Sequence, residues 1–291
     1  MYLDIDLHSH SLASDGTLSP AELVSLAQES GIKTLALTDH DETSGIAEAQ
    51  VAAERAGLRL IPGVEVSVSW NNRTIHVVGL NINPEDEALN NGLAKSRDYR
   101  NWRAEEMGRR LAKHGIFGSY EASREMAKGR IIARTHFARF LVEHGYATDM
   151  NDVFKKFLKP NKPGFVKGDW AGLEEAVSWI NGAGGVAVVA HPARYKLTAT
   201  KLRELFSQFV ECGGKGIEVI SGNQSRDVTF CMANYAKQFG LLTSVGSDFH
   251  DPDKSWNRMG RIPQLPKSCS PIWSEWFESD SSLSNSSAAS L

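Results

Sequence analysis

The sequence predicts an α/β fold in which a parallel sheet closes into a barrel and carries an all-helical insertion. Short, near-continuous apolar runs alternate with amphipathic helical patterns over the first 80 residues, and the alternation returns after residue 166. Repeated β–α units with strands this apolar are typical of parallel sheets with both faces covered. Residues 93–165 interrupt the rhythm with helical patterns and no strand signal.

The first segment of the predicted barrel core, residues 1–92, combines three strands with two helices. Ser19-Pro20 followed by Glu22 is typical of a helix start, with Ser as N-cap and Pro at the first helical position. The strands are expected over residues 3–7, over residues 34–38 and from residue 58, and the second helix over residues 43–56.

The second segment of the core, residues 166–277, repeats the alternation three times. Each unit pairs an amphipathic helix with a short apolar strand. The expected helices cover residues 173–181, 202–211 and 223–239, and the expected strands residues 185–190, 216–220 and 241–246. Residues 278–291 are rich in serine and are expected to form a disordered tail.

The insertion, residues 93–165, differs from the core in charge. Its helical patterns cover residues 93–114, 131–144 and 149–158. It contains 16 Lys and Arg against 8 Asp and Glu, a net charge of +8, whereas the rest of the chain carries −11 within a total of −3. A basic cap beside an acidic core suits an anionic substrate that exposes a second phosphate.

Within the insertion, Arg97, Arg100 and Arg103 recur every three residues and form a cationic stripe on one helix. A solvated helix face is the favoured interpretation of such a stripe. Trp102 and Phe137 could stack a nucleobase, but a core position on an amphipathic helix is favoured for both.

The composition also bears on the compartment. The N-terminus lacks the cationic and apolar regions of a secretory signal, and no apolar run is long enough to span a membrane. Cys212, Cys231 and Cys269 are widely spaced and odd in number, as expected for free thiols. We therefore expect a soluble cytoplasmic protein with no membrane partner.

Histidines and carboxylates gather at the ends of the predicted strands. His8 and His10 end the first strand with a spacing of two, so their side chains share one face. In barrels, polar residues at the carboxyl ends of strands line the active face. The complete set is His8, His10, Asp15, His40, Glu65, His76, His191, Asp248 and His250.

A predicted hairpin brings two members of this set together. Asn71-Asn72 can form a two-residue turn, which places Ser67 opposite His76. Glu65 then lies on the same face as His76, as a diagonal neighbour about 7–8 Å away at Cα. The two side chains can therefore share one metal ion.

A single histidine at a strand end is more often a hydrogen-bonded structural residue than a ligand. Nine donors at one end of successive strands are far harder to explain in that way. Nitrogen and oxygen donors without thiolate favour Mn²⁺, Fe²⁺ or Zn²⁺. Nine ligands exceed the needs of a single ion, so two or three ions are expected.

The ordered motif series resembles that of the PHP (polymerase and histidinol phosphatase) superfamily over about residues 1–92 and 166–262. The motifs are His8-x-His10 preceded by Asp6, Ser14-Asp15-Gly16, Thr38-Asp39-His40, Gly63-Val64-Glu65, His76, Ala190-His191-Pro192 and Ser247-Asp248-x-His250. The resemblance implies a distorted (β/α)7 barrel that holds a trinuclear metal centre, most often of manganese.

By the same resemblance, the nine donors divide into three ligand sets, with Glu65 shared between the first two. The first set is His8, His10, Glu65 and Asp248, the second is Glu65, His76 and His191, and the third is Asp15, His40 and His250.

Three further motifs resemble the branch of 3′,5′-nucleoside bisphosphate phosphatases and 5′–3′ exoribonucleases of the RNase AM type. They are Arg134-x-His136-x-Ala138, Lys162-Pro163-Gly164 and His191-Pro192-Ala193-Arg194. The resemblance implies hydrolysis of pAp to AMP and phosphate, and 5′-to-3′ degradation of short RNA. Arg134, Lys162 and Arg194 are the candidates for holding the phosphate that is not cleaved.

The expected mechanism is attack on phosphorus by a hydroxide that bridges two metal ions near Glu65 and Asp248. Asp248 is also a candidate proton acceptor. Asp6 and Asp39 either orient neighbouring imidazoles or cap strand ends and turns; the sequence does not separate these roles.

Two alternatives remain open at this stage. One is a histidinol-phosphate or other small phosphomonoester phosphatase, although a common variant of that enzyme has His where this chain has Asp15. The other is a non-catalytic metal-binding module of a nucleic-acid complex, against which the complete donor set argues. The sequence contains no DNA-specific motif, so any contact with long nucleic acid would be made to the backbone.

Overall fold

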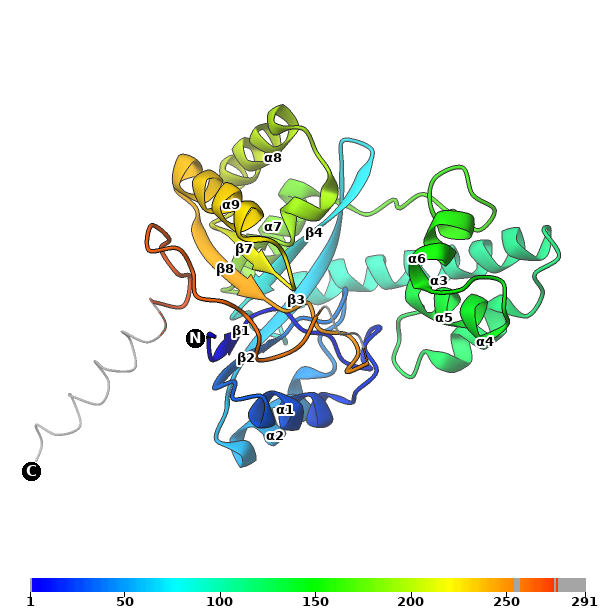
Figure 1. Ribbon diagram of the computed structural model, residues 1–291, viewed down its shortest axis with the longest axis horizontal. Coiled ribbons are helices and arrows are strands. Elements are labelled where there is room, and N and C mark those ends of the chain that lie inside the picture. The colour runs from blue at the N-terminus through cyan, green and yellow to red at the C-terminus, as the bar shows by residue number, and fades with distance from the viewer. Residues whose placement is uncertain (1, 254–256, 275, 277–291) are drawn as a thin grey trace, which may run out of the picture.

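The computed structural model describes residues 2–253, 257–274 and 276. The segment expected to be a disordered tail, residues 278–291, lies outside the described residues. The described chain forms a mixed α/β barrel from which a group of helices projects to one side, at the right of Figure 1. The fold class predicted from the sequence is confirmed.

The barrel wall is one sheet with strand order β1-β2-β3-β4-β6-β7-β8, and β5 pairs with β3 off this path. The strands are β1 (Ile5–Asp6), β2 (Thr34–Leu37), β3 (Arg59–Trp70), β4 (Arg73–Leu80), β5 (Ala171–Gly172), β6 (Val186–Val189), β7 (Gly216–Ser221) and β8 (Leu242–Gly246).

The sheet is parallel except at β4, which runs antiparallel to β3 and β6. This exception follows from the Asn71-Asn72 turn, because a two-residue loop can join only antiparallel strands. Both asparagines have positive φ, at 44° and 59°, as a type I′ turn requires. The predicted register is confirmed, since Ser67 pairs with His76.

The two edges of the sheet meet, so that the barrel is nearly closed. The Leu7 N–H donates to the Val245 carbonyl at 3.0 Å, and the Asp248 N–H to the His8 carbonyl at 2.9 Å. Gly246 permits this approach, because a Cβ there would lie 2.2 Å from the Cβ of His8. The seam thus places the first and last predicted motifs of the chain side by side.

Within the described ranges, five helices pack around the barrel. They are α1 (Pro20–Glu29), α2 (Ile46–Ala56), α7 (Leu173–Gly182), α8 (Ala199–Glu211) and α9 (Arg226–Phe239). The predicted start of α1 is confirmed: the Ser19 side chain accepts a hydrogen bond from the Glu22 N–H, and the Glu22 carboxylate accepts one from the Ser19 N–H.

The projecting group consists of α3 (Glu87–Ala112), α4 (Ser119–Met126), α5 (Arg134–Glu143) and α6 (Met150–Val153), which continues into a π-helical turn, Phe154–Leu158. Prediction missed α4. These helices have their own apolar cluster, which includes Met107, Leu111 and Phe137. The N-terminal turns of α3 pack instead into the barrel core through Leu89 and Leu93, so one helix joins the two packed regions.

None of the helices in the described part of the chain is long and apolar enough to cross a membrane.

Candidate metal centre and substrate cavity

The structure brings all nine predicted donors together at the carboxyl ends of the parallel strands. His8 and His10 follow β1, His40 follows β2, and His191 follows β6. Asp248 and His250 follow β8, Asp15 lies in the β1–α1 connection, and Glu65 lies within β3. His76 lies in the first half of β4, which reaches the same end because that strand is antiparallel.

Glu65 is at the centre of the cluster and is completely buried. Its Oε1 lies 2.8 Å from His76 Nδ1 and 2.9 Å from His191 Nε2. Its Oε2 lies 2.8 Å from His40 Nδ1 and 3.3 Å from the Nε2 atoms of both His8 and His10. Five imidazoles therefore converge on one carboxylate. Although burial alone would raise the pKa of Glu65, the surrounding histidines hold it well below its usual range.

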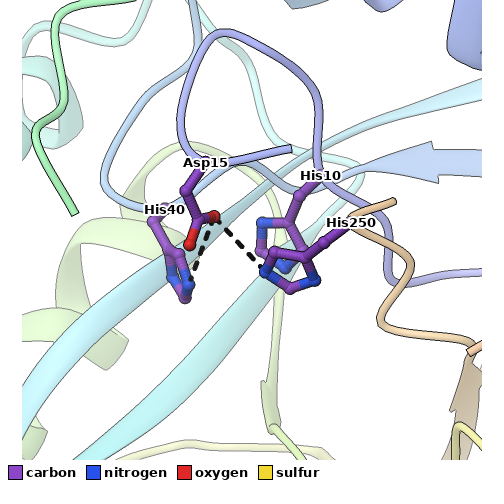
Figure 2. Close-up of side chains that lie close together, drawn as sticks. All are labelled: His10, Asp15, His40 and His250. Atoms are coloured by element: carbon purple, nitrogen blue, oxygen red, sulfur yellow. Dashed lines mark ion pairs between the residues drawn. The ribbon is translucent and has the colours of Figure 1, made fainter. Parts of the chain in front are cut away.

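A second group surrounds Asp15 (Figure 2). Asp15 Oδ1 lies 3.3 Å from His250 Nε2 and 3.9 Å from His40 Nε2. The rings of His10 and His250 stack with centroids 4.1 Å apart. These four residues offer ligand atoms that all lie within 4.8 Å of one another.

Three other groups meet the same spacing: His8 with Glu65 and His191, His8 with His10 and Asp248, and His40 with Glu65 and His76. Several buried ligand atoms lie close to one another but form no hydrogen bond of acceptable geometry in the described structure; they are His10 Nδ1, Asp15 Oδ1, His40 Nδ1, Glu65 Oε2 and His191 Nδ1. Buried polar atoms are rarely left in this state. The donor types and their spacing suit divalent ions, so the cluster can bind metal.

Two donors hold strained backbone conformations. His191 has φ of 31° and Asp248 of 54°, in the left-handed region that non-glycine residues seldom occupy. Asp41, one residue after His40, has φ of 49°. Such strain persists where surrounding contacts enforce it, and it concentrates at functional sites.

Glu218, on β7, was missed by the sequence analysis. Its Oε1 lies 2.5 Å from His8 Nδ1, and its Oε2 accepts the His191 N–H at 2.6 Å. It therefore orients one donor through the side chain and another through the backbone. The available signal was an acidic residue in an otherwise apolar strand.

Asp6 and Asp39 contact backbone and hydroxyl groups rather than imidazoles in the described structure. Asp39 accepts hydrogen bonds from the Ser11 hydroxyl at 2.6 Å and from the Ser14 hydroxyl at 2.5 Å. It therefore supports the loop that carries Asp15. Asp6 accepts the Ser247 N–H at 2.9 Å across the barrel seam. Of the two roles left open for them, the contacts match turn and strand-end capping.

The titration of the cluster follows from burial and neighbouring charge. Burial lowers the pKa of His40 to about 4 despite its carboxylate neighbours. Burial also acts to lower the pKa of His10, but contacts with Asp248 and Glu65 prevail and raise it to about 10. Burial raises the pKa of Asp6 to about 6.

The cluster opens into a cavity of about 240 Å³. Seven of the nine donors line it, together with Arg194 from the barrel and residues from the helical region. The helical residues include Arg100, Arg103, Arg134, Thr135 and Phe154. We refer to Arg100, Arg103 and Arg134 as the arginine wall.

The three wall arginines differ in their partners. Arg100 Nε donates to Asp41 Oδ2 and its Nη2 to Ser67 Oγ, both at 2.7 Å. Arg103 Nε donates to the Val166 carbonyl at 3.1 Å, and no ion pair links its guanidinium to a carboxylate among the described residues. Burial, with the nearby Arg134 and Arg100, lowers the pKa of Arg103 to about 9.

Arg134 has no hydrogen bond or ion pair to any residue that the structure describes. Its guanidinium lies over the ring of Phe154, 5.6 Å from the centroid. Burying cations side by side without carboxylates is costly. The arrangement therefore suits an anion that enters the cavity.

The other two predicted phosphate contacts, Arg194 and Lys162, lie apart from the arginine wall. Arg194, in the short 3-10 helix Pro192–Tyr195, bonds to Asp248 Oδ2 and donates to Ser221 Oγ at 2.9 Å. Arg194 thus lies at the β7–β8 side of the barrel, whereas Arg100 contacts β3. Lys162 is exposed and is not among the residues that line the cavity.

Two expectations for the insertion were wrong. Arg100 and Arg103 are buried at 7% and 8% exposure, so they do not form a solvated face. Trp102, expected in the core, is 53% exposed. Phe137 is completely buried, which confirms its core position. Arg100 and Arg103 lie on the same buried face of α3 as Leu93 and Met107, and their helical spacing from these apolar residues was the signal that the arginines point inward.

The chain is similar to several known proteins. A family model described as the PHP domain matches residues 6–221. The chain is 48% identical over 273 residues to a 3′,5′-nucleoside bisphosphate phosphatase of Chromobacterium violaceum, covering 94% of this chain and 96% of the relative. It is 45% identical over 273 residues to the 5′–3′ exoribonuclease Rnm of Escherichia coli, covering 93% of each.

Two solved structures share the fold of this chain. An amidohydrolase of Chromobacterium violaceum, with sulfate and without metal, superposes with a TM-score of 0.91 at 47% identity, over 95% of this chain and 96% of that one. A protein of Bifidobacterium adolescentis described as a metal-dependent phosphoesterase superposes with a TM-score of 0.77 at 27% identity, over 92% of each chain.

Proposed function

The chain belongs to the PHP domain family and is a hydrolytic enzyme, and from this premise we propose that it removes the 3′-phosphate from 3′,5′-bisphosphonucleotides such as pAp. We further propose that it degrades short 5′-phosphorylated RNA from the 5′ end. The two activities are one chemistry. In each, the phosphorus bond to a 3′ oxygen breaks and a bond to a water oxygen forms.

One observation carries this proposal: a single cavity joins the histidine–carboxylate cluster to arginines that lack carboxylate partners. A substrate with two phosphates can place one at the cluster and the other at the arginine wall. A simple phosphomonoester has no group for the wall. The geometry therefore favours the bisphosphate.

We propose that the nine donors hold three divalent ions in the ligand sets that the family resemblance implies, with Mn²⁺ as the preferred metal. The first set is His8, His10, Glu65 and Asp248, the second is Glu65, His76 and His191, and the third is Asp15, His40 and His250. Bound there, divalent ions supply activation of water and neutralisation of phosphate charge.

The protein groups have separate tasks in this proposal. Arg103 and Arg134 hold the 5′-phosphate, and Arg100 is fixed beside them by Asp41. Arg194 faces the phosphate that is cleaved, because its guanidinium contacts Asp248. Asp248 accepts the proton that the attacking water loses. Lys162 is left without a role, because its side chain is exposed away from the lining of the cavity.

The test compares pAp with 3′-AMP, which lacks the 5′-phosphate. Wild-type enzyme should have the higher kcat/KM on pAp, and Arg134→Ala should lower that value about 10–100-fold while changing 3′-AMP hydrolysis little, since a charged hydrogen-bond partner is lost. Arg124→Ala is the matched control, because Arg124 is exposed in the same helical region. Equal rates on pAp and 3′-AMP in the wild type would instead indicate a small phosphomonoester phosphatase.

A further inference from the structure

A second cavity lies beside the catalytic one, at the carboxyl ends of β7 and β8. It has a volume of about 380 Å³, and its lining includes Gly222, Asn223, Ser247, Arg258 and Arg261. We refer to it as the side cavity. Neither the metal cluster nor the arginine wall uses it, although a space of this size can accommodate a nucleotide-sized ligand.

The side cavity adjoins the groups that face the cleaved phosphate. Ser247 directly precedes Asp248, and Gly222 directly follows Ser221, which Arg194 contacts. A Cβ at Gly222 would lie 3.1 Å from Arg194 Nη2 and 2.5 Å from Asn257 Oδ1. The backbone of Gly222, which lines the side cavity, therefore lies close to both Arg194 and Asn257.

The charge of the side cavity suits nucleic acid. Arg258 and Arg261 are both exposed, and neither forms an ion pair with a residue of the described ranges. No carboxylate is among the described residues that line it. Tyr2 also lines the side cavity; it is 51% exposed, and the Arg261 guanidinium lies 5.3 Å from its ring centroid. Cations beside an open aromatic ring can bind phosphate and stack a base.

Its position also suits the direction of an RNA substrate. The arginine wall contacts the barrel at β3, through Ser67, whereas the side cavity opens at β7 and β8. These strands lie on opposite sides of the barrel ring. A strand whose 5′-phosphate is held at the wall and whose first 3′ linkage lies at the cluster can therefore continue toward the side cavity.

We propose that the side cavity binds the RNA nucleotide on the 3′ side of the cleaved bond. This inference rests on the proposed function and adds a subsite to it. This subsite would contact only one of the two proposed substrates. pAp ends at its 3′-phosphate and does not reach the side cavity, whereas an oligoribonucleotide does.

The test measures kcat/KM on a 5′-phosphorylated triribonucleotide and on pAp in the same enzyme preparations. Arg258→Ala and Arg261→Ala should each lower the ratio of RNA to pAp activity about tenfold, and should reduce the salt dependence of RNA cleavage, because one phosphate contact is lost. Arg226→Ala is the control: this arginine is exposed on α9 and does not line the side cavity. An unchanged ratio in both side-cavity variants overturns the inference.

Binding separates this inference from the proposed function. Calorimetry with a phosphorothioate triribonucleotide should show weaker binding to Arg261→Ala than to the wild type, whether or not pAp is hydrolysed. Equal affinities overturn the side-cavity assignment and leave the bisphosphatase proposal standing. Failure of the wild type to hydrolyse pAp, with the binding difference intact, overturns only the bisphosphatase proposal.

Discussion

The barrel side and the helical side of the cavity differ in how their charged groups are partnered. On the barrel side, Glu65 is surrounded by five imidazoles, and Asp248 contacts both Arg194 and His10. On the helical side, Arg103 donates to a carbonyl and has no carboxylate partner among the described residues, and Arg134 lies against an aromatic ring. The barrel side combines carboxylates with imidazoles, a ligand set that suits metal cations, whereas the helical side has excess positive charge, which suits an anion.

This difference implies that reactivity and substrate choice are built into separate regions. Changes on the barrel side should lower hydrolysis of every substrate, whereas changes on the helical side should alter discrimination between substrates or the stability of the helices. Three further experiments test this division, in order of decreasing expected effect.

The largest effect is expected for Asp248→Asn. Loss of the carboxylate removes both a donor and the proposed proton acceptor, so kcat should fall about 10²–10⁴-fold on pAp and 3′-AMP alike. Steady-state kinetics and elemental analysis of bound metal give the measurement. Asp253→Asn, at an exposed position nearby, should behave as wild type. A fall in kcat on pAp but not on 3′-AMP would contradict the division between the two sides, because Asp248 would then determine substrate specificity.

A smaller effect is expected for Glu218→Gln. The amide keeps the size of the side chain but weakens its contacts with His8 Nδ1 and the His191 backbone. Metal affinity or activity should fall about 10–100-fold, again on both substrates. Metal titration followed by activity assays measures this, with Glu54→Gln on the exposed face of α2 as control. Unchanged metal affinity would show that Glu218 only stabilises the barrel.

The smallest effect concerns stability of the helical side. Burial lowers the pKa of His136, on α5, to about 4, below its usual value of 6.5. Its Nδ1 accepts the Ala133 N–H at 3.0 Å, which requires an unprotonated nitrogen. As the pH falls from about 6.5 to 4, the unfolded chain takes up a proton that the folded chain does not. Stability from this group therefore falls by about 1.4 kcal/mol per pH unit in that window.

Urea unfolding at pH 7.5 and pH 5 measures this slope. The wild type should lose more stability between the two pH values than His136→Gln, in which the group that titrates is missing. Parallel losses in both proteins would mean that barrel residues, such as Asp6 with its pKa of about 6, account for the acid sensitivity.

Much of the barrel and of the donor set could be predicted from the sequence because the signals are local. The Ser19 capping box and the Asn71-Asn72 turn are specified within a few residues, and the turn alone set the register of Glu65 and His76. Short helices carry weaker signals: α4 was missed, since its sequence, SYEASREM, shows little apolar periodicity.

By itself, then, the sequence determined the fold class and which nine histidine and carboxylate side chains gather, because strand ends and residue spacing place them at one end of the barrel. Only the tertiary structure decided which charges face the cavity. Arg100 and Arg103 turn inward because the apolar residues before and after them bury the same face of α3 in two separate cores. Glu218 reaches His8 across 210 residues of sequence, and Gly222 lies beside Arg194. The last two contacts depend on which elements meet in the closed barrel, and the spacing of residues along one element does not determine that.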